Sequence, residues 1–238
     1  MRLAVFADVH ANIYALQSVL KDIEKRHVDK IICAGDLVGY APFPNEVIEL
    51  IQSMDIPTVM GNYDDGVGFH RIQCGCDYKD EHARMLGEKS ILWTKKNTTE
   101  ANKEFLRSLP KEIWFKAGGY RCLVVHGSPR RLNEYLYEDT PEDYLKALLE
   151  EFNVDVLICG HTHKPYHRRI QGRHVINVGS VGRPKHGDPQ AVYALVEITG
   201  EVKVIFYKVD YDYDKTAKAI EESELPDELA EVIRWGRE

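Results

Sequence analysis

The acidic, amide and imidazole side chains of this sequence gather at the ends of short apolar runs. The runs end in the fragments DVH, GD, GNYD, HG and GHTH, which contribute Asp8, His10, Asp36, Asn62, His126, His161 and His163. All are oxygen or imidazole donors, a set that suits a divalent ion of intermediate hardness such as Mn, Fe, Ni or Zn. They exceed the needs of one tetrahedral site, but they suit two ions about 3.5–4 Å apart that share a bridging carboxylate. The sequence therefore predicts a dinuclear metal site.

Each fragment alone is weak evidence for a metal. Asp8 and His10 are compatible with turn chemistry, and the two histidines of GHTH are compatible with a solvated loop whose imidazoles bind backbone groups. The five fragments occur in order, however, each at the end of a predicted strand, where open α/β sheets bind ligands. A glycine precedes Asp36, Asn62 and His161, and we expect each of these glycines to adopt a positive φ beside its ligand.

Strand-length apolar runs alternate with helical patterns along the chain. We predict strands at 2–8, 29–36, 56–62, 120–127, 154–161, 173–180, 191–198 and 202–209. We predict helices at 12–26, 44–54, 99–110, 140–152, 214–223 and 227–235. Because the stretch 166–209 lacks a helical pattern, we expect it to form a second, more antiparallel sheet. The expected fold is α/β, a four-layer α/β/β/α sandwich of two mixed sheets flanked by helices, in a single domain over 1–238.

Composition narrows the class of protein. The 238 residues include 31 Lys and Arg against 38 Asp and Glu, a net charge of −7, so we expect no extended nucleic-acid surface. No run of about 18 apolar residues occurs, and the first residues do not resemble a signal peptide, so we expect no membrane span and a cytoplasmic location. An oligomer is compatible with the sequence.

The five cysteines do not suggest a disulfide framework. Cys33, Cys122 and Cys159 lie in strand-like runs, where a free thiol behaves as a small hydrophobe. Cys74 and Cys76 form CGC on a glycine-rich stretch, and their role stays open.

The order D-x-H, G-D, G-N, H-G and G-H-x-H resembles that of the calcineurin-like metallophosphoesterase superfamily. The stretches GDLVGYAPFPNEVIELI, HGSPRRLNEYLY and NVGSVGRPKHGDP are similar to its small bacterial and archaeal phosphodiesterase branch. The resemblance implies one metal held by Asp8, His10, Asp36 and His163. It implies a second metal held by Asp36, Asn62, His126 and His161, with Asp36 bridging. It also implies manganese as the first choice of ion, with Fe, Ni or Zn as alternatives, and attack on phosphorus by a hydroxide that bridges the metals.

One position departs from the family pattern. Most members have a histidine after the G-N asparagine, as the general acid for the leaving group, and this chain has Tyr63. A phenol with a pKa near 10 is poorly matched to neutral pH, and the phosphodiesterase branch commonly lacks this histidine. Asp64 is expected to support the loop or a ligand, and His70, His82 and His186 are alternative proton donors. The residues assigned to catalysis are Asp36, Asn62, Tyr63 and Asp64.

The expected substrate contacts are Asn12, Tyr40 and Arg183. Asn12 also suits the N-cap of the first helix, and both roles are compatible. The stretch 64–78 is long enough to be a lid.

The leading hypothesis is a phosphodiesterase for a small or nucleotide-like diester; a phosphomonoesterase is disfavoured by Tyr63. A non-catalytic protein-binding module, as in a retromer subunit that resembles this fold, and a sensor of metal or nucleotide are the alternatives from other classes.

Overall fold

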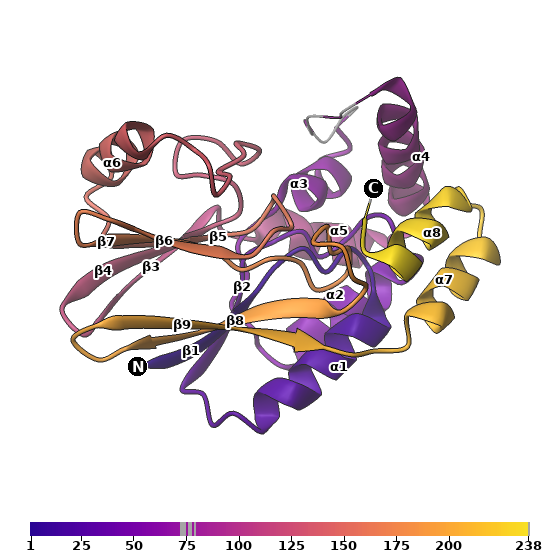
Figure 1. Ribbon diagram of the computed structural model, residues 1–238. Helices are drawn as coiled ribbons and strands as arrows, with labels where there is room; N and C mark the ends of the chain where they lie inside the picture. The colour runs from indigo at the N-terminus through magenta and orange to yellow at the C-terminus, as the bar shows by residue number, and fades with distance from the viewer. Residues whose placement is uncertain (72–74, 76–77, 79, 238) are drawn as a thin grey trace.

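Two β-sheets lie face to face between helices in the computed structural model, which describes residues 1–71, 75, 78 and 80–237 (Figure 1). The first sheet has four strands in the order β2-β1-β8-β9. They are β1 (Arg2–Phe6), β2 (Lys30–Cys33), β8 (Ala191–Ile198) and β9 (Val202–Val209). β1 pairs in parallel with β2 and antiparallel with β8, and β8 pairs antiparallel with β9. The sheet is therefore mixed.

The second sheet is also mixed and has five strands in the order β3-β4-β5-β7-β6. They are β3 (Glu112–Ala117), β4 (Tyr120–Val125), β5 (Val156–Cys159), β6 (Tyr166–Ile170) and β7 (Arg173–Asn177). The central β4, β5 and β7 run parallel, and the outer β3 and β6 pair antiparallel. The carboxyl ends of β4 and β5 consequently lie at one edge of this sheet.

Helices cover the outer face of each sheet. They are α1 (Ile13–Glu24), α2 (Pro44–Ser53), α3 (Asn62–Gly68), α4 (Glu81–Asn97), α5 (Glu100–Ser108), α6 (Glu142–Glu151), α7 (Tyr213–Glu221) and α8 (Glu228–Trp235). α6 packs on the second sheet, whereas α1, α2, α7 and α8 share a buried cluster with the first (Figure 1). The four-layer sandwich predicted from the sequence is confirmed. Within the described residues, no helix is both long and apolar enough to cross a bilayer.

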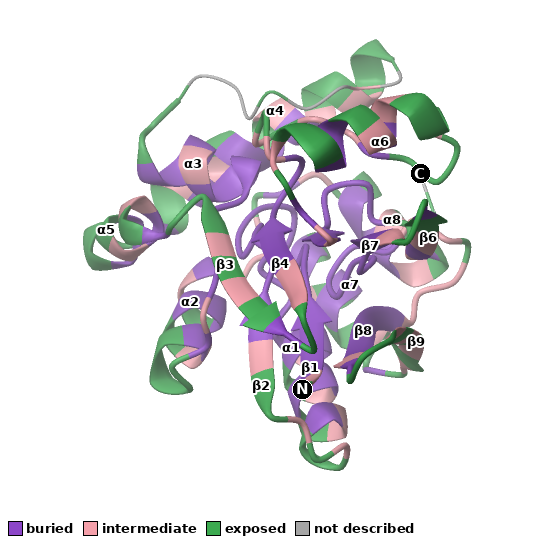
Figure 2. Ribbon diagram, turned by 90° about the vertical axis from the view of Figure 1, so that its left-hand side faces the viewer, coloured by how far each residue is buried: buried purple, intermediate pink, exposed green. Residues whose placement is uncertain are grey.

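Strand periodicity divides the core into layers. Leu3 and Val5 of β1 pack between the sheets, whereas Ala4 and Phe6 pack toward the helices. Successive strand residues point to opposite faces, so a strand that is apolar at every position is covered on both sides. The inner strands are accordingly buried along most of their length (Figure 2). Their carboxyl ends hold the loops described below against a rigid core.

Two sequence-based expectations about the fold were wrong. The run 56–62 is not a strand: Thr58 makes one isolated parallel bridge to Cys33, and the backbone then enters α3. Its apolar residues are buried beside β2, which explains their strand-like composition. The stretch 166–209 does form four strands, but β6 and β7 extend the second sheet while β8 and β9 extend the first. A separate antiparallel sheet is therefore absent from the described structure.

The sequence analysis also missed three elements, namely β3, α3 and α4. β3 is a short edge strand whose alternating half-buried residues do carry the period of two. α4 buries Gly87, Ser90, Ile91 and Thr94, a face of mostly small or polar side chains that lacks the apolar stripe of an ordinary amphipathic helix. α3 covers the first part of the stretch 64–78, which the sequence analysis took for a loop.

Candidate metal centre

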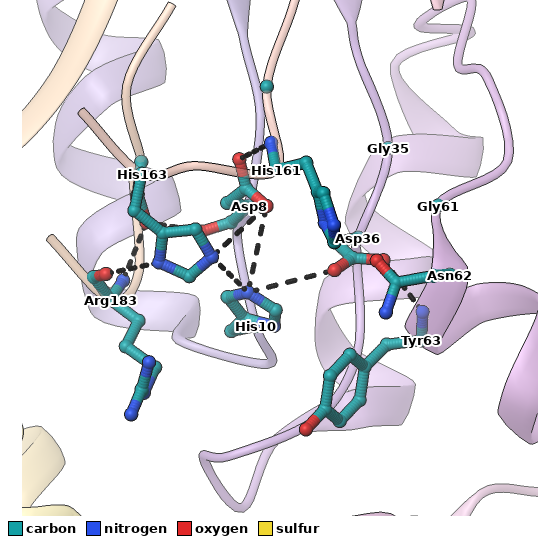
Figure 3. Close-up of polar contacts among 12 residues, drawn as sticks. Asp8, His10, Gly35, Asp36, Gly61, Asn62, Tyr63, His161, His163 and Arg183 are labelled. Carbon is teal, nitrogen blue, oxygen red and sulfur yellow. Dashed lines mark hydrogen bonds and ion pairs between the residues drawn. The ribbon is translucent and has the colours of Figure 1, made fainter. Parts of the chain in front are cut away.

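The loops that follow β1, β2, β4 and β5 converge on one buried cluster of side chains (Figure 3). All of the metal ligands expected from the sequence lie in it, and each is at most a few percent exposed. We call this set the ligand cluster: Asp8, His10, Asp36, Asn62, His126, His161 and His163. Its members come from both sheets, so the cluster forms only when the two sheets are stacked.

The first half of the cluster consists of Asp8, His10 and His163, whose ligand atoms lie within 4.8 Å of one another. His163 Nε2 is 3.3 Å from Asp8 Oδ1, and His10 Nε2 is 3.7 Å from the same oxygen. The other oxygen, Asp8 Oδ2, accepts a hydrogen bond of 3.0 Å from the N–H of His161. One carboxylate oxygen and two imidazole nitrogens therefore lie close enough together to bind a single ion.

The second half consists of Asp36, His126 and His161, again within 4.8 Å, together with Asn62. His126 Nε2 lies 2.9 Å from Asn62 Oδ1 and 3.2 Å from His161 Nδ1. The two histidines of GHTH thus belong to different halves, although only Thr162 separates them. The division agrees with the two ligand sets that the family resemblance implies.

Asp36 stands between the halves. Its Oδ2 lies 3.8 Å from His10 Nε2 and 3.4 Å from His126 Nε2, one histidine from each half. Its Oδ1 accepts a hydrogen bond of 2.8 Å from the N–H of Tyr63, which fixes the rotation of the carboxylate. A single carboxylate oriented toward both groups is the arrangement that a bridging ligand requires.

The hydrogen bonds around the histidines indicate that the cluster is built for cations. His10 Nδ1 lies 3.1 Å from the carbonyl oxygen of Val38, and His163 and His126 make the same contact with other carbonyls at 2.6 and 2.9 Å. A ring nitrogen that donates outward leaves, on a neutral imidazole, a lone pair pointing inward. The inward nitrogens of His10 and His163 are 3.1 Å apart. Asp8 Oδ1 is buried and has no hydrogen-bond partner among the described residues. Divalent ions would satisfy these facing lone pairs, and the oxygen and imidazole donors fit them.

Burial and neighbouring charges shift the protonation of the cluster. Burial, with a contribution from His163, lowers the pKa of His10 to about 3, and burial lowers the pKa of His161 as well. Burial also opposes the charged form of His126, but the Asp36 carboxylate outweighs it and raises the pKa of His126 to about 10. The inward lone pairs of His10 and His161 are therefore available at neutral pH, whereas a cation near Asp36 must displace the His126 proton.

The backbone of the ligand loops is strained where the ligands sit. Left-handed φ values between 46° and 67° occur at Asp8, His10, Asp36, His161 and His163. Side chains with a Cβ rarely adopt this region, and each such residue costs about 1 kcal/mol or more. The surrounding loops hold these conformations through hydrogen bonds such as His10 N–H to the Asp36 carbonyl. Strain of this kind gathers at functional sites.

The expectation that the preceding glycines adopt positive φ holds for one of them. Gly35 has φ +91°. Gly61 has φ −93°, and a Cβ there would lie 2.1 Å from Asp36 Oδ1; a Cβ on Gly160 would lie 2.7 Å from Asp8 Oδ2. Gly61 and Gly160 are therefore required for close approach to a carboxylate and not for their φ.

Comparison with known proteins gives the family. A model of the calcineurin-like phosphoesterase superfamily domain matches residues 1–201. This chain belongs to that superfamily. It is 34% identical to an uncharacterized protein of Methanocaldococcus jannaschii over 99% of this chain and 98% of the relative. A metallophosphoesterase structure from Sphaerobacter thermophilus is 31% identical with a TM-score of 0.80, each chain being covered to 99%. A hypothetical protein of Pyrococcus horikoshii is 25% identical with a TM-score of 0.86, over 99% of this chain and 98% of that one.

Asp64 supports the metal centre by binding the backbone of the loops that hold its ligands. Its carboxylate accepts hydrogen bonds from the backbone N–H groups of Asp36, Leu37 and Gly61, at 2.8 to 2.9 Å. It thereby ties the loop after β2 to the start of α3. Burial, followed by the charge of Asp36, raises the pKa of Asp64 to about 7. The side chain therefore positions the bridging ligand, and among the described residues no hydrogen bond joins it to a ligand histidine.

Asn12 is the N-cap of α1, and its side chain is buried. Its Oδ1 accepts hydrogen bonds from Ala15 N–H and the Thr216 hydroxyl, and its Nδ2 donates to the Gly182 carbonyl and the Tyr211 hydroxyl. A primary amide has two donors and two acceptor lone pairs, so its capacity is filled by protein groups. Asn12 therefore anchors the 179–183 loop, and we assign it no substrate contact.

Aromatic side chains and one arginine line one side of the phosphoesterase centre. The rings of Tyr40 and Tyr63 lie 4.9 and 5.4 Å from the ring of His10, and the Arg183 guanidinium lies 4.2 Å from the Tyr40 ring. The hydroxyls of Tyr63 and Tyr78 are 3.5 Å apart. We call Tyr40, Tyr63, Tyr78 and Arg183 the aromatic wall. Figure 3 shows the Tyr63 hydroxyl and the Arg183 guanidinium pointing away from the ligand atoms.

The remaining candidates lie outside the ligand cluster. His70 and His82 are exposed, and His186 is paired with Asp188 at 2.9 Å. Of the proposed lid, residues 64–68 belong to α3. Cys74 and Cys76 lie outside the described residues.

Sequence analysis missed Tyr135, whose ring lies 4.0 Å from that of His161 and stacks on Tyr137. It also missed Tyr78. Tyr135 lies in the stretch HGSPRRLNEYLY and Tyr78 ends the stretch 64–78, but neither directly follows a predicted strand, so nothing in the sequence marked either as part of the site.

Proposed function

We propose that this phosphoesterase is a dinuclear phosphodiesterase that hydrolyses small or nucleotide-like diesters. The observation that supports it most is the position of Asp36, whose carboxylate faces a histidine of each half of the ligand cluster. Asp8, His10, Asp36 and His163 would hold one ion, and Asp36, Asn62, His126 and His161 the other. A bound pair of divalent ions, manganese being our first choice, provides a nucleophile at neutral pH and neutralises phosphoryl charge.

The residues of the chain hold this centre in place. The Tyr63 N–H orients Asp36, Asp64 joins the two loops that meet there, and outward hydrogen bonds fix the ring orientation of His10, His126 and His163. Rigid placement of ligands lowers the cost of reorganisation during the reaction. These contacts support a preformed site.

The orientation of the Tyr63 side chain favours diesters as the substrates. Its hydroxyl points away from the ligand atoms, toward Tyr78, so we assign it no proton transfer to the leaving group. General acid catalysis typically contributes about 10²–10⁴-fold, and its loss affects substrates with basic leaving groups most. Tyr40 and Arg183 are the substrate contacts that we retain, because they flank the first half of the cluster.

The test is hydrolysis of bis(p-nitrophenyl) phosphate and p-nitrophenyl phosphate, measured side by side in Mn, Ni, Mg and Zn. Both esters release the same leaving group, so their ratio reports the preference for diester over monoester. We expect metal-dependent turnover that favours the diester and disappears with a chelator. Preference for the monoester would replace the proposal with a phosphomonoesterase. No turnover of either ester by protein shown to contain metal would favour a binding role.

A further inference from the structure

A pocket of about 210 Å³ opens beside the aromatic wall, between α4 and α8. Its lining comes from four separate parts of the chain: the loop after β2, the start of α4, the 179–188 loop and α8. The residues that form it are Tyr40, Tyr78, Asp80, His82, Ala83, Leu86, Arg183, Glu228 and Val232. None of them belongs to the ligand cluster, so the pocket is distinct from the metal centre.

The pocket nevertheless adjoins the metal centre, because only two of its lining residues, Tyr40 and Arg183, lie between them. The Tyr40 ring meets the ring of His10 edge-on at 4.9 Å on one side and lines the pocket on the other. The backbone carbonyl of Arg183 accepts from His163, while its side chain stacks over Tyr40 and lines the pocket. A phosphoryl group at the metals would therefore place its organic substituent beside this opening.

The chemistry of the lining suits a flat ring with polar edges. Tyr78 contributes an aromatic ring, the Arg183 guanidinium lies over the buried Tyr40 ring, and Leu86 and Val232 add aliphatic surface. Asp80 Oδ1 caps α4 by accepting from the Ala83 N–H, so the second oxygen of Asp80 and the carboxylate of Glu228 are the acceptors for an amine. Nucleobases bind proteins in this way, by stacking on aromatic rings or guanidinium planes and by edge hydrogen bonds. A polyol or a short alkyl group would leave the aromatic faces unused.

The volume of the pocket suits a ligand group the size of one ring system. Sites for drug-sized ligands measure about 300–1,000 Å³, so this pocket takes part of a ligand and not a whole dinucleotide.

One wall of the pocket depends on a glycine inside a helix. A Cβ on Gly87 of α4 would lie 2.2 Å from the Tyr78 hydroxyl. Glycine in a helix interior costs about 0.5–1 kcal/mol relative to alanine, and here it makes room for that tyrosine.

We propose that this pocket binds the nucleobase of a nucleotide-like ester, with a preference for a base that carries an exocyclic amine, such as adenine. The inference rests on the proposed function for the phosphoryl end of the ligand and adds the identity of the organic group. Tyr78 and Arg183 stack with the base, Tyr40 supports the guanidinium from behind, and Asp80 and Glu228 accept from the amine.

The test compares AMP with ribose 5-phosphate, which share a sugar phosphate and differ by the base. Binding of each to the manganese-loaded protein is measured by calorimetry, with free phosphate assayed afterwards to confirm that the ligand is intact. We expect AMP to bind about tenfold more tightly, as stacking of one base provides. Ala83→Trp, which fills the pocket, should abolish that advantage and leave ribose 5-phosphate binding unchanged. The matched control is Met85→Trp on the same helix, outside the lining.

Val232→Phe fills the pocket from α8 and serves as a second variant if Ala83→Trp does not fold. Retained ribose 5-phosphate binding shows that a variant is folded and loaded with metal. Equal affinity for the two ligands in the wild type, or no binding of either, overturns the inference. So does an AMP advantage that survives both filled variants. These readouts are binding constants, so failure here is separate from failure to hydrolyse the p-nitrophenyl esters.

Discussion

The ligand cluster and the aromatic wall lie side by side but are held in place by different means. Ligand side chains are fixed by the backbone, as when the Tyr63 N–H binds Asp36 or the Val38 carbonyl faces His10. The wall is held mainly by contacts between side chains, such as the guanidinium of Arg183 over the Tyr40 ring. Backbone contacts survive most substitutions nearby, whereas side-chain contacts change with each residue that makes them.

This difference suggests a division of labour. Under the proposed function, the cluster would determine what reaction takes place, because its donors would select and orient the ions. The wall would determine which ester fits, because Tyr40 and Arg183 separate the cluster from the pocket between α4 and α8. Substitutions in the cluster should therefore reduce turnover of every substrate, and substitutions in the wall should change the ratio between substrates.

The largest expected effect is that of Asp36→Asn. Two-metal charge stabilisation is worth several kcal/mol, so loss of the bridging carboxylate should lower kcat by about 10³-fold or more for all esters. Asparagine keeps an oxygen for the Tyr63 N–H and tolerates the left-handed φ of 57°, so the fold should survive. Steady-state kinetics measures the fall in kcat, and circular dichroism shows whether the fold survives.

Asp55→Asn is a matched control, because Asp55 is exposed and has nearly the same backbone conformation, with φ 55°. It should behave as the wild type. Full activity in Asp36→Asn would contradict the two-metal scheme, and an equal loss in both variants would point to a general effect of the substitution.

Metal removal should have the next largest effect, on the stability of the cluster. Ions that bind the folded chain stabilise it by mass action, and their removal takes away that stabilisation and leaves the inward nitrogens of His10 and His163 facing each other at 3.1 Å. We expect elemental analysis of the loaded protein to find close to two divalent ions per chain. Chelation should lower Tm by about 5–10 °C, reversibly. An unchanged Tm, or full activity with a single tightly bound ion, would contradict this.

Gly61→Ala should have a smaller but specific effect on the cluster. The added Cβ would lie 2.1 Å from Asp36 Oδ1 and 2.2 Å from its backbone nitrogen, so the bridging ligand must move. Overpacking of this kind costs about 1–3 kcal/mol, and metal affinity should fall with it. Gly68→Ala, at the other end of α3, meets its nearest atom at 3.3 Å and should be tolerated. Chemical denaturation and metal titration of both variants measure the difference; equal behaviour would show that Gly61 is not needed for close approach.

The same contrast explains what the sequence could predict. The ligands follow β1, β2, β4 and β5, whose apolar residues are covered on both faces and therefore form continuous runs. A ligand directly after such a run is visible without any tertiary information. The two layers of helices follow from the same alternation of apolar runs and amphipathic patterns. Even so, the run 56–62 shows that a buried loop beside a strand has the same composition as a strand.

The wall could not be predicted in this way. Tyr78 belongs to no motif, and it is placed by its contact with Tyr63 and by Gly87 of α4. α4 itself escaped prediction because its buried face is made of mostly small or polar residues. Conversely, the sequence predicted a phosphate contact for Asn12, but in the structure its amide donors and acceptor bind other protein groups. Side-chain partners that come from distant parts of the chain leave no local pattern.

The smallest expected effect is that of Tyr63→Phe, and it tests the boundary between cluster and wall. The substitution removes the hydroxyl that lies 3.5 Å from Tyr78 and keeps the ring and the N–H that orients Asp36. If the hydroxyl belongs only to the wall, kcat on bis(p-nitrophenyl) phosphate should stay within about twofold, since general acid catalysis, where it operates, contributes about 10²–10⁴-fold. A fall of that size would show that the phenol protonates the leaving group and belongs to the reaction.

Tyr63→His completes this test by adding the acid that most of the superfamily has at this position. It should raise hydrolysis of esters with alkyl leaving groups by about tenfold, because a histidine titrates near neutral pH and a phenol does not. Esters with p-nitrophenolate as the leaving group should change little, since that group departs without a proton. A gain for both classes of ester would mean that the variant changes binding and not proton transfer. Absence of a gain for the alkyl esters would mean that the proton reaches the leaving group from elsewhere, and His82 on the pocket edge is then the residue to substitute next.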